Sequence, residues 1–182
     1  YFTIGGRRTK SGLYRVTYQG EAEVQADGVK QKGLEDRKLR RRLESLHRPI
    51  GVEAVKPALA ELGSTDRFIR YASRIALEHQ TPELWQNEVL THQDDQVALN
   101  GMLGLTRVGD PALRKRILNR LYEIEFGMLT EVQQILWLRV YGLVFMRMGE
   151  ATAEDAQEIR KRLEPEFPSV NAAINSELLK LL

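Results

Sequence analysis

The chain has 182 residues, a formal net charge of +2 and no cysteine. Its 42% hydrophobic content, with 14 Gly and 6 Pro, excludes collagen-like, low-complexity and fully disordered proteins and allows one ordinary domain or a small array of repeats. Without cysteine, these residues cannot supply disulfides, thiolate catalysis, Cys-ligated zinc, iron–sulfur clusters or covalent c-type haem.

The charge is unevenly distributed. Residues 1–50 hold 12 Lys/Arg against 6 Asp/Glu, whereas residues 51–182 hold 15 against 19. The chain starts without Met and shows neither a charged leader nor an apolar run of the roughly 18 to 20 residues that a membrane span needs. We interpret it as a section of a longer protein.

Residues 1–20 have the pattern of a β-hairpin. β-branched and aromatic residues flank a stretch between Gly5 and Gly12, and the second flank alternates in side-chain character from Leu13 to Tyr18. Because an isolated hairpin is marginally stable in water, we expect it to be the end of a β-domain that lies upstream. Residues 21–33, which are polar and rich in glycine, are predicted to be a linker.

From Leu34 onwards the apolar residues recur with helical spacing. Leu39, Leu43 and Leu46 form one stripe, and later helices begin at capping signals such as Asp110-Pro111 and the Thr130/Gln133 capping box. The predicted helices cover about 34–47, 52–62, 66–79, 82–91, 95–107, 111–124, 131–148, 153–163 and 170–182.

A weak internal repeat runs through the helical section. A shift of 28 residues places Asp66 on Asp94, and a shift of 29 places Pro82 on Pro111. Each unit is a helix, a turn with proline and a second helix, which needs neighbours to bury its apolar stripe. We therefore predict an all-α fold over 34–182: a right-handed superhelix, or α-solenoid, of about four antiparallel helix pairs and a closing helix.

One repeat resembles the HEAT family. The run from Asp66 to Ser73, followed by Ala76-Leu77, is similar to the HEAT pattern of Asp, then Val or Ile, then Arg and small residues. In such repeats the Asp and Arg link adjacent turns. The corresponding run from Asp94 departs from the pattern, because Ala98 replaces the arginine.

A second resemblance covers nearly the full chain. The run from Gly5 to Tyr18 resembles the last propeller blade of large secreted bacterial proteins related to membrane-bound and sorbosone-type sugar dehydrogenases, and the segments 39–47, 66–80 and 141–149 resemble their HEAT-like helices. The resemblance implies an upstream β-propeller, a downstream c-type cytochrome and a periplasmic or extracellular location. No Cys-x-x-Cys-His is present, and the resemblance implies that the propeller residues that hold a quinone cofactor and base would lie upstream. We therefore assign no catalytic residue, no cofactor-binding residue and no metal ligand to this chain.

The best candidate for an interaction surface is a basic run on the first predicted helix. It comprises Arg37, Lys38, Arg40, Arg41 and Arg42. A basic helix can contact phosphates, but Glu35, Asp36 and Glu44 dilute the charge. A solvated face, or docking against an acidic neighbouring domain, is the preferred interpretation, and nucleic acid is the lesser one.

The other conspicuous residues are interpreted as structural. His47, His79 and His92 fall at predicted helix ends, where they can satisfy terminal carbonyls. Trp137 lies in an apolar run and is predicted to be core, with Gly142 nearby allowing a close helix contact. The leading functional hypothesis is a non-catalytic scaffold within a larger dehydrogenase-like protein. The alternatives are a stand-alone peptide-binding module and, less favoured, nucleic-acid binding through Arg37–Arg42.

Overall fold

The computed structural model describes residues 1–6, 10–20 and 33–182. They form two units, Tyr1–Lys32 and Gly33–Leu182, each with its own internal contacts. The division falls one residue before the predicted start of the helical section at Leu34, and the predicted linker, residues 21–33, lies outside the described residues except for Gly33.

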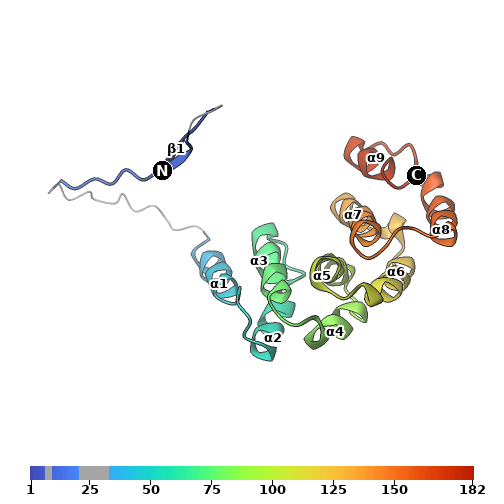
Figure 1. Ribbon diagram of the computed structural model, residues 1–182, viewed down its shortest axis with the longest axis horizontal. Helices are drawn as coiled ribbons and strands as arrows, with labels where there is room; N and C mark the ends of the chain where they lie inside the picture. Colours follow the sequence, from blue (N-terminus) through green and yellow to red (C-terminus); the bar gives the residue numbers. More distant parts are fainter. Residues whose placement is uncertain (7–9, 21–32) are drawn as a thin grey trace. The chain divides into compact units, whose positions relative to one another are not determined.

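The first unit contains the predicted hairpin. Strands β1 (Phe2–Ile4) and β2 (Gly12–Tyr14) pair antiparallel, with Phe2 opposite Tyr14 (Figure 1). The rings of these two residues stack with centroids 5.3 Å apart. The second strand is shorter than the alternating pattern predicted, and Val16 and Tyr18 beyond it are exposed.

The second unit is entirely helical in its regular structure, as predicted. Its α-helices are α1 (Leu34–Glu44), α2 (Val52–Glu61), α3 (Arg67–Glu78), α4 (Gln86–Leu90), α5 (Asp95–Val108), α6 (Arg114–Glu123), α7 (Glu131–Arg147), α8 (Ala153–Leu163) and α9 (Ala172–Leu178). No described helix is both long enough and apolar enough to cross a bilayer.

The helices of this unit lie in two rows (Figure 1). The inner row consists of α1, α3, α5, α7 and α9, each packed against the next odd-numbered helix. The outer row consists of α2, α4, α6 and α8, and α2, α4 and α6 each pack on the inner helix that follows them in the chain. The rows curve, with the inner row on the concave side (Figure 1).

Local sequence signals explain where most helices begin. Asp66 and Asp94, which the shift of 28 residues superposes, adopt nearly identical backbone angles and each accepts hydrogen bonds from the amides two and three residues further on. Thr130 forms the predicted capping box, and Thr152 forms a second one with Asp155. The sequence repeat is thus a structural repeat at the helix starts.

Two predicted helices are interrupted. The segments Pro82–Leu84 and Pro111–Leu113 are 3-10 turns that precede α4 and α6. At Trp85 the backbone leaves the helical region, with φ of −140°, and the buried indole donates a hydrogen bond from Nε1 to the Gln80 carbonyl at 3.4 Å. The burial of this large ring therefore accompanies the break.

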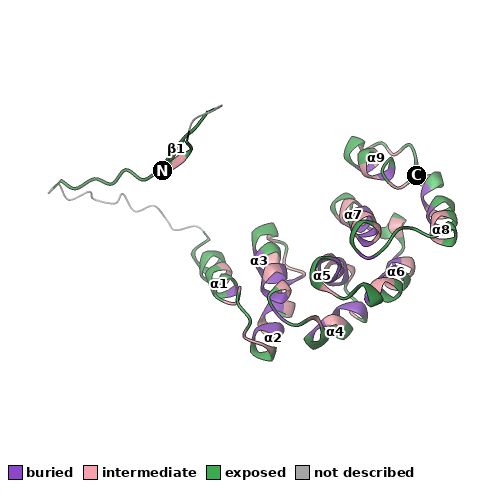
Figure 2. Ribbon diagram, viewed as in Figure 1, coloured by how far each residue is buried: buried purple, intermediate pink, exposed green. Residues whose placement is uncertain are grey.

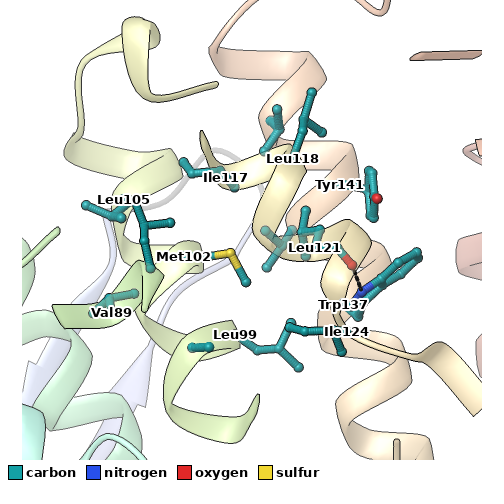
Figure 3. Close-up of a cluster of buried hydrophobic side chains, with 14 of the residues drawn as sticks. Val89, Leu99, Met102, Leu105, Ile117, Leu118, Leu121, Ile124, Trp137 and Tyr141 are labelled. Carbon is teal, nitrogen blue, oxygen red and sulfur yellow. Dashed lines mark hydrogen bonds between the residues drawn. The ribbon is translucent and has the colours of Figure 1, made fainter. Parts of the chain in front are cut away.

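The main hydrophobic cluster draws its buried residues from both rows of helices (Figure 2). Trp137 is core, as predicted: it is 1% exposed and its Nε1 donates to the Leu121 carbonyl at 3.2 Å (Figure 3). A smaller cluster of buried residues, Leu43, Ile69 and Ala72, joins α1 to α3. The other two leucines of the predicted stripe, Leu39 and Leu46, are partly buried and pack against it.

The prediction for Gly142 is wrong. A Cβ built on Gly142 would meet no atom within 4 Å, so this glycine makes no close helix contact. The close contact is at Gly101 of α5, where a Cβ would lie 2.9 Å from the Cβ of Val89 in α4. Gly101 therefore lets α4 and α5 approach.

Candidate interaction groove on the inner row

The predicted basic surface on α1 is partly neutralised by its own helix. Lys38 pairs with Glu35 at 2.8 Å, and Arg40 pairs with Glu44 at 3.2 Å. Arg37, Arg41 and Arg42 are exposed. Two of the acidic residues that dilute the run in the sequence, Glu35 and Glu44, therefore also pair with its cations in the structure.

The histidines make structural contacts, but contrary to the prediction none of them bonds, among the described residues, a terminal carbonyl of the helix that it ends. The Nε2 of His47 lies 2.8 Å from the Ala72 carbonyl oxygen, and its ring stacks on His79 with centroids 5.9 Å apart. The Nδ1 of His92 accepts from the Asp94 amide at 3.0 Å. In the parts of the chain that the structure describes, no three His, Cys, Asp or Glu side chains cluster as metal ligands would.

A groove that the sequence did not predict lies across α3, α5 and α7. Its volume is about 370 Å³. Four arginines, one tyrosine and several aliphatic and amide side chains line this groove. We call it the arginine end. Its lining residues are Arg67, Arg70, Tyr71, Arg74, Gln96, Asn100, Leu103, Val132, Ile135, Leu136 and Arg139.

The arginines of this groove differ in how they are held. Arg74 is buried, stacks over the Tyr71 ring at 5.3 Å and forms an ion pair with Glu78. Glu78 also pairs with Arg107 of α5 at 3.0 Å, which ties two inner helices together.

Two other arginines of the arginine end contact no carboxylate. Arg70 donates to the carbonyls of Ser64 and Thr65 at 2.5 and 2.9 Å, and Arg67 lies over the Phe68 ring at 4.6 Å. Within the described ranges, neither is in ion-pair distance of a carboxylate. The side-chain hydrogen bonds of Asp66 and Arg70 all lie within residues 64–70. Other residues therefore link this segment to the neighbouring helix pairs.

The groove continues towards α9. A second depression of about 430 Å³ lies between α5, α7 and α9 and shares Leu103 and Arg139 with the arginine end. Apolar side chains dominate it, and we call it the apolar end. Its lining residues are Leu103, Leu138, Arg139, Gly142, Leu143, Met146, Glu177, Lys180 and Leu181. The two ends together are the inner groove.

An ion pair stands at the junction of the two ends. The Nε of Arg139 is 3.0 Å from Oε1 of Glu177. The other oxygen of this carboxylate, Oε2, pairs with Nζ of Lys180 at 2.7 Å. Burial of the Glu177 carboxyl favours its neutral form, but the hydrogen bonds from Lys180 and Arg139 outweigh burial and lower its pKa. The carboxylate is therefore charged at neutral pH and holds α9 against α7.

The outer row carries a polar depression that serves the packing of α6 and α8. Asp155 accepts from Thr152 and pairs with Arg114 of α6. Burial raises the pKa of Asp155, but these hydrogen bonds outweigh it, and the net pKa is lowered. Arg162 lies over the Tyr122 ring at 4.9 Å and donates to the Tyr122 carbonyl. These contacts join α6 and α8.

The inner groove was missed because four helices build it. Arg67, Arg70, Tyr71 and Arg74 recur at the spacing of one helix face, and that pattern could have indicated a basic aromatic stripe. No local pattern could show that Val132 and Arg139 of α7 line the same depression as the arginines of α3.

Comparison with known proteins identifies no relative: no protein-family model, no curated protein and no solved structure matches the chain. The geometry of the inner groove is therefore the observation from which a function has to be argued.

Proposed function

We propose that residues 34–182 form a HEAT-like α-solenoid, a right-handed superhelix of antiparallel helix pairs, and that this solenoid is a non-catalytic protein-interaction domain. The two rows of helices support the architecture, as do the matching N-caps at Asp66 and Asp94. Stacked helical repeats offer extended concave surfaces, and proteins of this type use those surfaces for binding.

The observation that carries the proposal is the inner groove itself. It crosses four successive inner helices, and large apolar side chains beside it or within it remain in contact with solvent. Tyr71, Val132 and Met146, which line it, are 59%, 64% and 79% exposed. Apolar side chains gathered on one face, rather than scattered singly, mark interaction surfaces.

The resemblance to dehydrogenase-like proteins suggests where such a domain would work. We propose a bacterial parent protein outside the cytoplasm. In it the solenoid packs against, or spaces, an upstream propeller and a downstream cytochrome, and other domains carry out catalysis. The alternative is a stand-alone module that binds a separate protein or peptide. We do not extend the proposal to nucleic acid, because Glu35 and Glu44 pair with cations of α1.

Site-specific photocrosslinking in cells that carry the gene tests the proposal. A benzophenone amino acid replaces Tyr71 or Met146 beside the inner groove, and Glu88 of α4 or Arg160 of α8, both exposed, serve as outer-row controls. We expect adducts from the inner positions only. An adduct within the parent chain supports the scaffold, and an adduct with a separate protein supports the stand-alone module. Equal adducts from Glu88 and Arg160, or none from any position, would contradict the proposal.

A further inference from the structure

Resting on the proposed function, we infer that the inner groove binds an extended acidic peptide segment in one orientation. The carboxylates of the segment lie at the arginine end, against Arg67 and Arg70, and its apolar side chains lie at the apolar end, along Leu143 and Met146. The partner is thus a peptide whose negative charge is confined to one half.

Charge complementarity favours carboxylates at the arginine end. Four arginines line this depression, and none of its described lining residues is acidic. The charge of Arg74 is matched by Glu78, and that of Arg139 by Glu177. Arg67 and Arg70 have carbonyl and aromatic neighbours instead, and neither contact neutralises a guanidinium charge. The end therefore has an excess of about two positive charges that a partner's carboxylates can approach.

The neighbouring acidic residue, Asp66, caps α3. Its Oδ1 accepts from the amides of Phe68 and Ile69, at 2.7 and 3.2 Å, and the carboxylate complements the helix dipole there. Among the described residues it forms no ion pair with Arg67 or Arg70. The guanidinium of Arg70 reaches the carbonyls of the preceding turn rather than this carboxylate.

The apolar end favours aliphatic or aromatic side chains. Leu138, Leu143, Met146 and Leu181 line it, and Gly142 leaves open space at the backbone of α7. Its only lining carboxylate among the described residues is Glu177, which Arg139 and Lys180 already pair. Arg139 and Lys180 share this one carboxylate, so the apolar end has one cation in excess where the arginine end has about two.

The length of the groove sets the length of the segment. Neighbouring helices pack about 8 to 10 Å apart, so the three steps from α3 to α9 span roughly 25 to 30 Å. An extended chain rises about 3.3 Å per residue, and eight or nine residues therefore cover the groove.

A peptide fits this distribution better than a nucleic-acid strand. A strand carries one negative charge at every nucleotide, so it requires cations along its whole path. The inner groove has four arginines at one end, whereas the other end is mainly apolar and its two cations share one carboxylate. Charge at one end and apolar side chains at the other is a property that peptides have and oligonucleotides lack.

Fluorescence anisotropy with labelled ten-residue peptides tests the inference. The probes carry four Glu or Asp in one half and Leu and Phe in the other, in both chain directions. Matched peptides have Gln and Asn in place of the acids, and a ten-residue oligothymidylate is the competitor. We expect at least one acidic peptide to bind, to weaken at high salt, and to lose about tenfold in affinity when its acids are neutralised.

Variants of the protein locate the site. Arg67→Glu should weaken binding of the acidic peptide about tenfold, and Gly142→Leu, which fills the apolar end, should weaken it as well. Arg160→Glu on the outer row makes the same charge change away from the groove and should leave affinity unchanged. Circular dichroism of each variant confirms that the helices are intact.

Four results would overturn the inference. They are no binding by any acidic peptide, binding no tighter than that of the neutral matches, equal losses from Arg67→Glu and Arg160→Glu, and tighter binding of the oligothymidylate. Failure here is separable from failure of the proposed function. Crosslinks from Tyr71 in cells together with no acidic-peptide binding would retain an interaction domain and reject this class of partner.

Discussion

Replacing Gly101 with alanine should destabilise the helical unit, although alanine is the better helix former. Gly101 lies in the interior of α5 and is buried. An added Cβ would lie 2.9 Å from the Cβ of Val89 and closer still to both methyl carbons of that side chain. Ordinary carbon contacts are about 3.5 to 4.0 Å, so α4 would have to move away from α5.

Two opposing effects determine the magnitude. Glycine to alanine in a helix interior gains up to about 1 kcal/mol in helix propensity. Overpacking a well-filled core costs about 1 to 3 kcal/mol, and Val89 is fully buried with a stiff β-branched side chain. We expect a net loss of about 1 to 2 kcal/mol. For a domain of this size that loss lowers the unfolding temperature by roughly 2 to 8 °C.

Thermal unfolding followed by far-ultraviolet circular dichroism measures this effect, and the same change at Gly142 is the control. Gly142 lies in α7 with no atom near its missing Cβ. Gly142→Ala should therefore raise the unfolding temperature, through about 0.5 to 1 kcal/mol of helix propensity. In a Val89→Ala background, Gly101→Ala should cost at least about 1 kcal/mol less than in the wild type. If Gly101→Ala is neutral or stabilising, α4 and α5 do not meet at this glycine.

Three further predictions address the joints of the molecule. Gln80→Leu should cost about 2 to 4 kcal/mol and speed hydrogen exchange at Ile50 and Gly51, because the buried Gln80 amide accepts from both N–H groups and donates to three carbonyls; unchanged exchange would contradict it. Stability should fall as pH drops below about 5, because the lowered pKa values of Asp155 and Glu177 mean that the unfolded chain binds more protons there; an Asp155→Asn, Glu177→Gln double variant should show a shallower fall in unfolding temperature between pH 7 and 3. A chain of residues 33–182 should unfold at the same temperature as the full chain, because every member of the two hydrophobic clusters is Leu39 or a later residue. A lower unfolding temperature would show that the first unit contributes to stability.

The helices could be predicted because their signals are local. Asp66, Thr130 and Thr152 act on amides within three residues, and a capping side chain performs this function whatever the rest of the fold is. The break at Trp85 could not be predicted in this way. The segment has a good Thr-Pro start, but the indole is buried between the rows and the backbone turns out of the helix at this residue.

The roles of the glycines and of the groove depend on contacts between distant residues. Gly101 and Gly142 both occur in apolar helical runs, and only the position of Val89 distinguishes the close contact from the open one. The basic run on α1 is visible as consecutive residues in the sequence, whereas Arg67 and Arg139 of the arginine end lie more than 70 residues apart in the chain. Residue spacing within one helix carries no information about such a meeting.

The ion pairs between helices determine which arginines of the inner groove a partner can use. Arg74 is buried and its carboxylate partner, Glu78, also holds Arg107 of the next inner helix, so reversing the charge of Arg74 would break a seam inside the domain. Arg67 is exposed and holds no seam, so reversing its charge changes the groove without changing the stacking of the helices. Binding and folding are therefore separable on this surface, and a loss of affinity in Arg67→Glu with an unchanged unfolding temperature would be attributable to the groove alone.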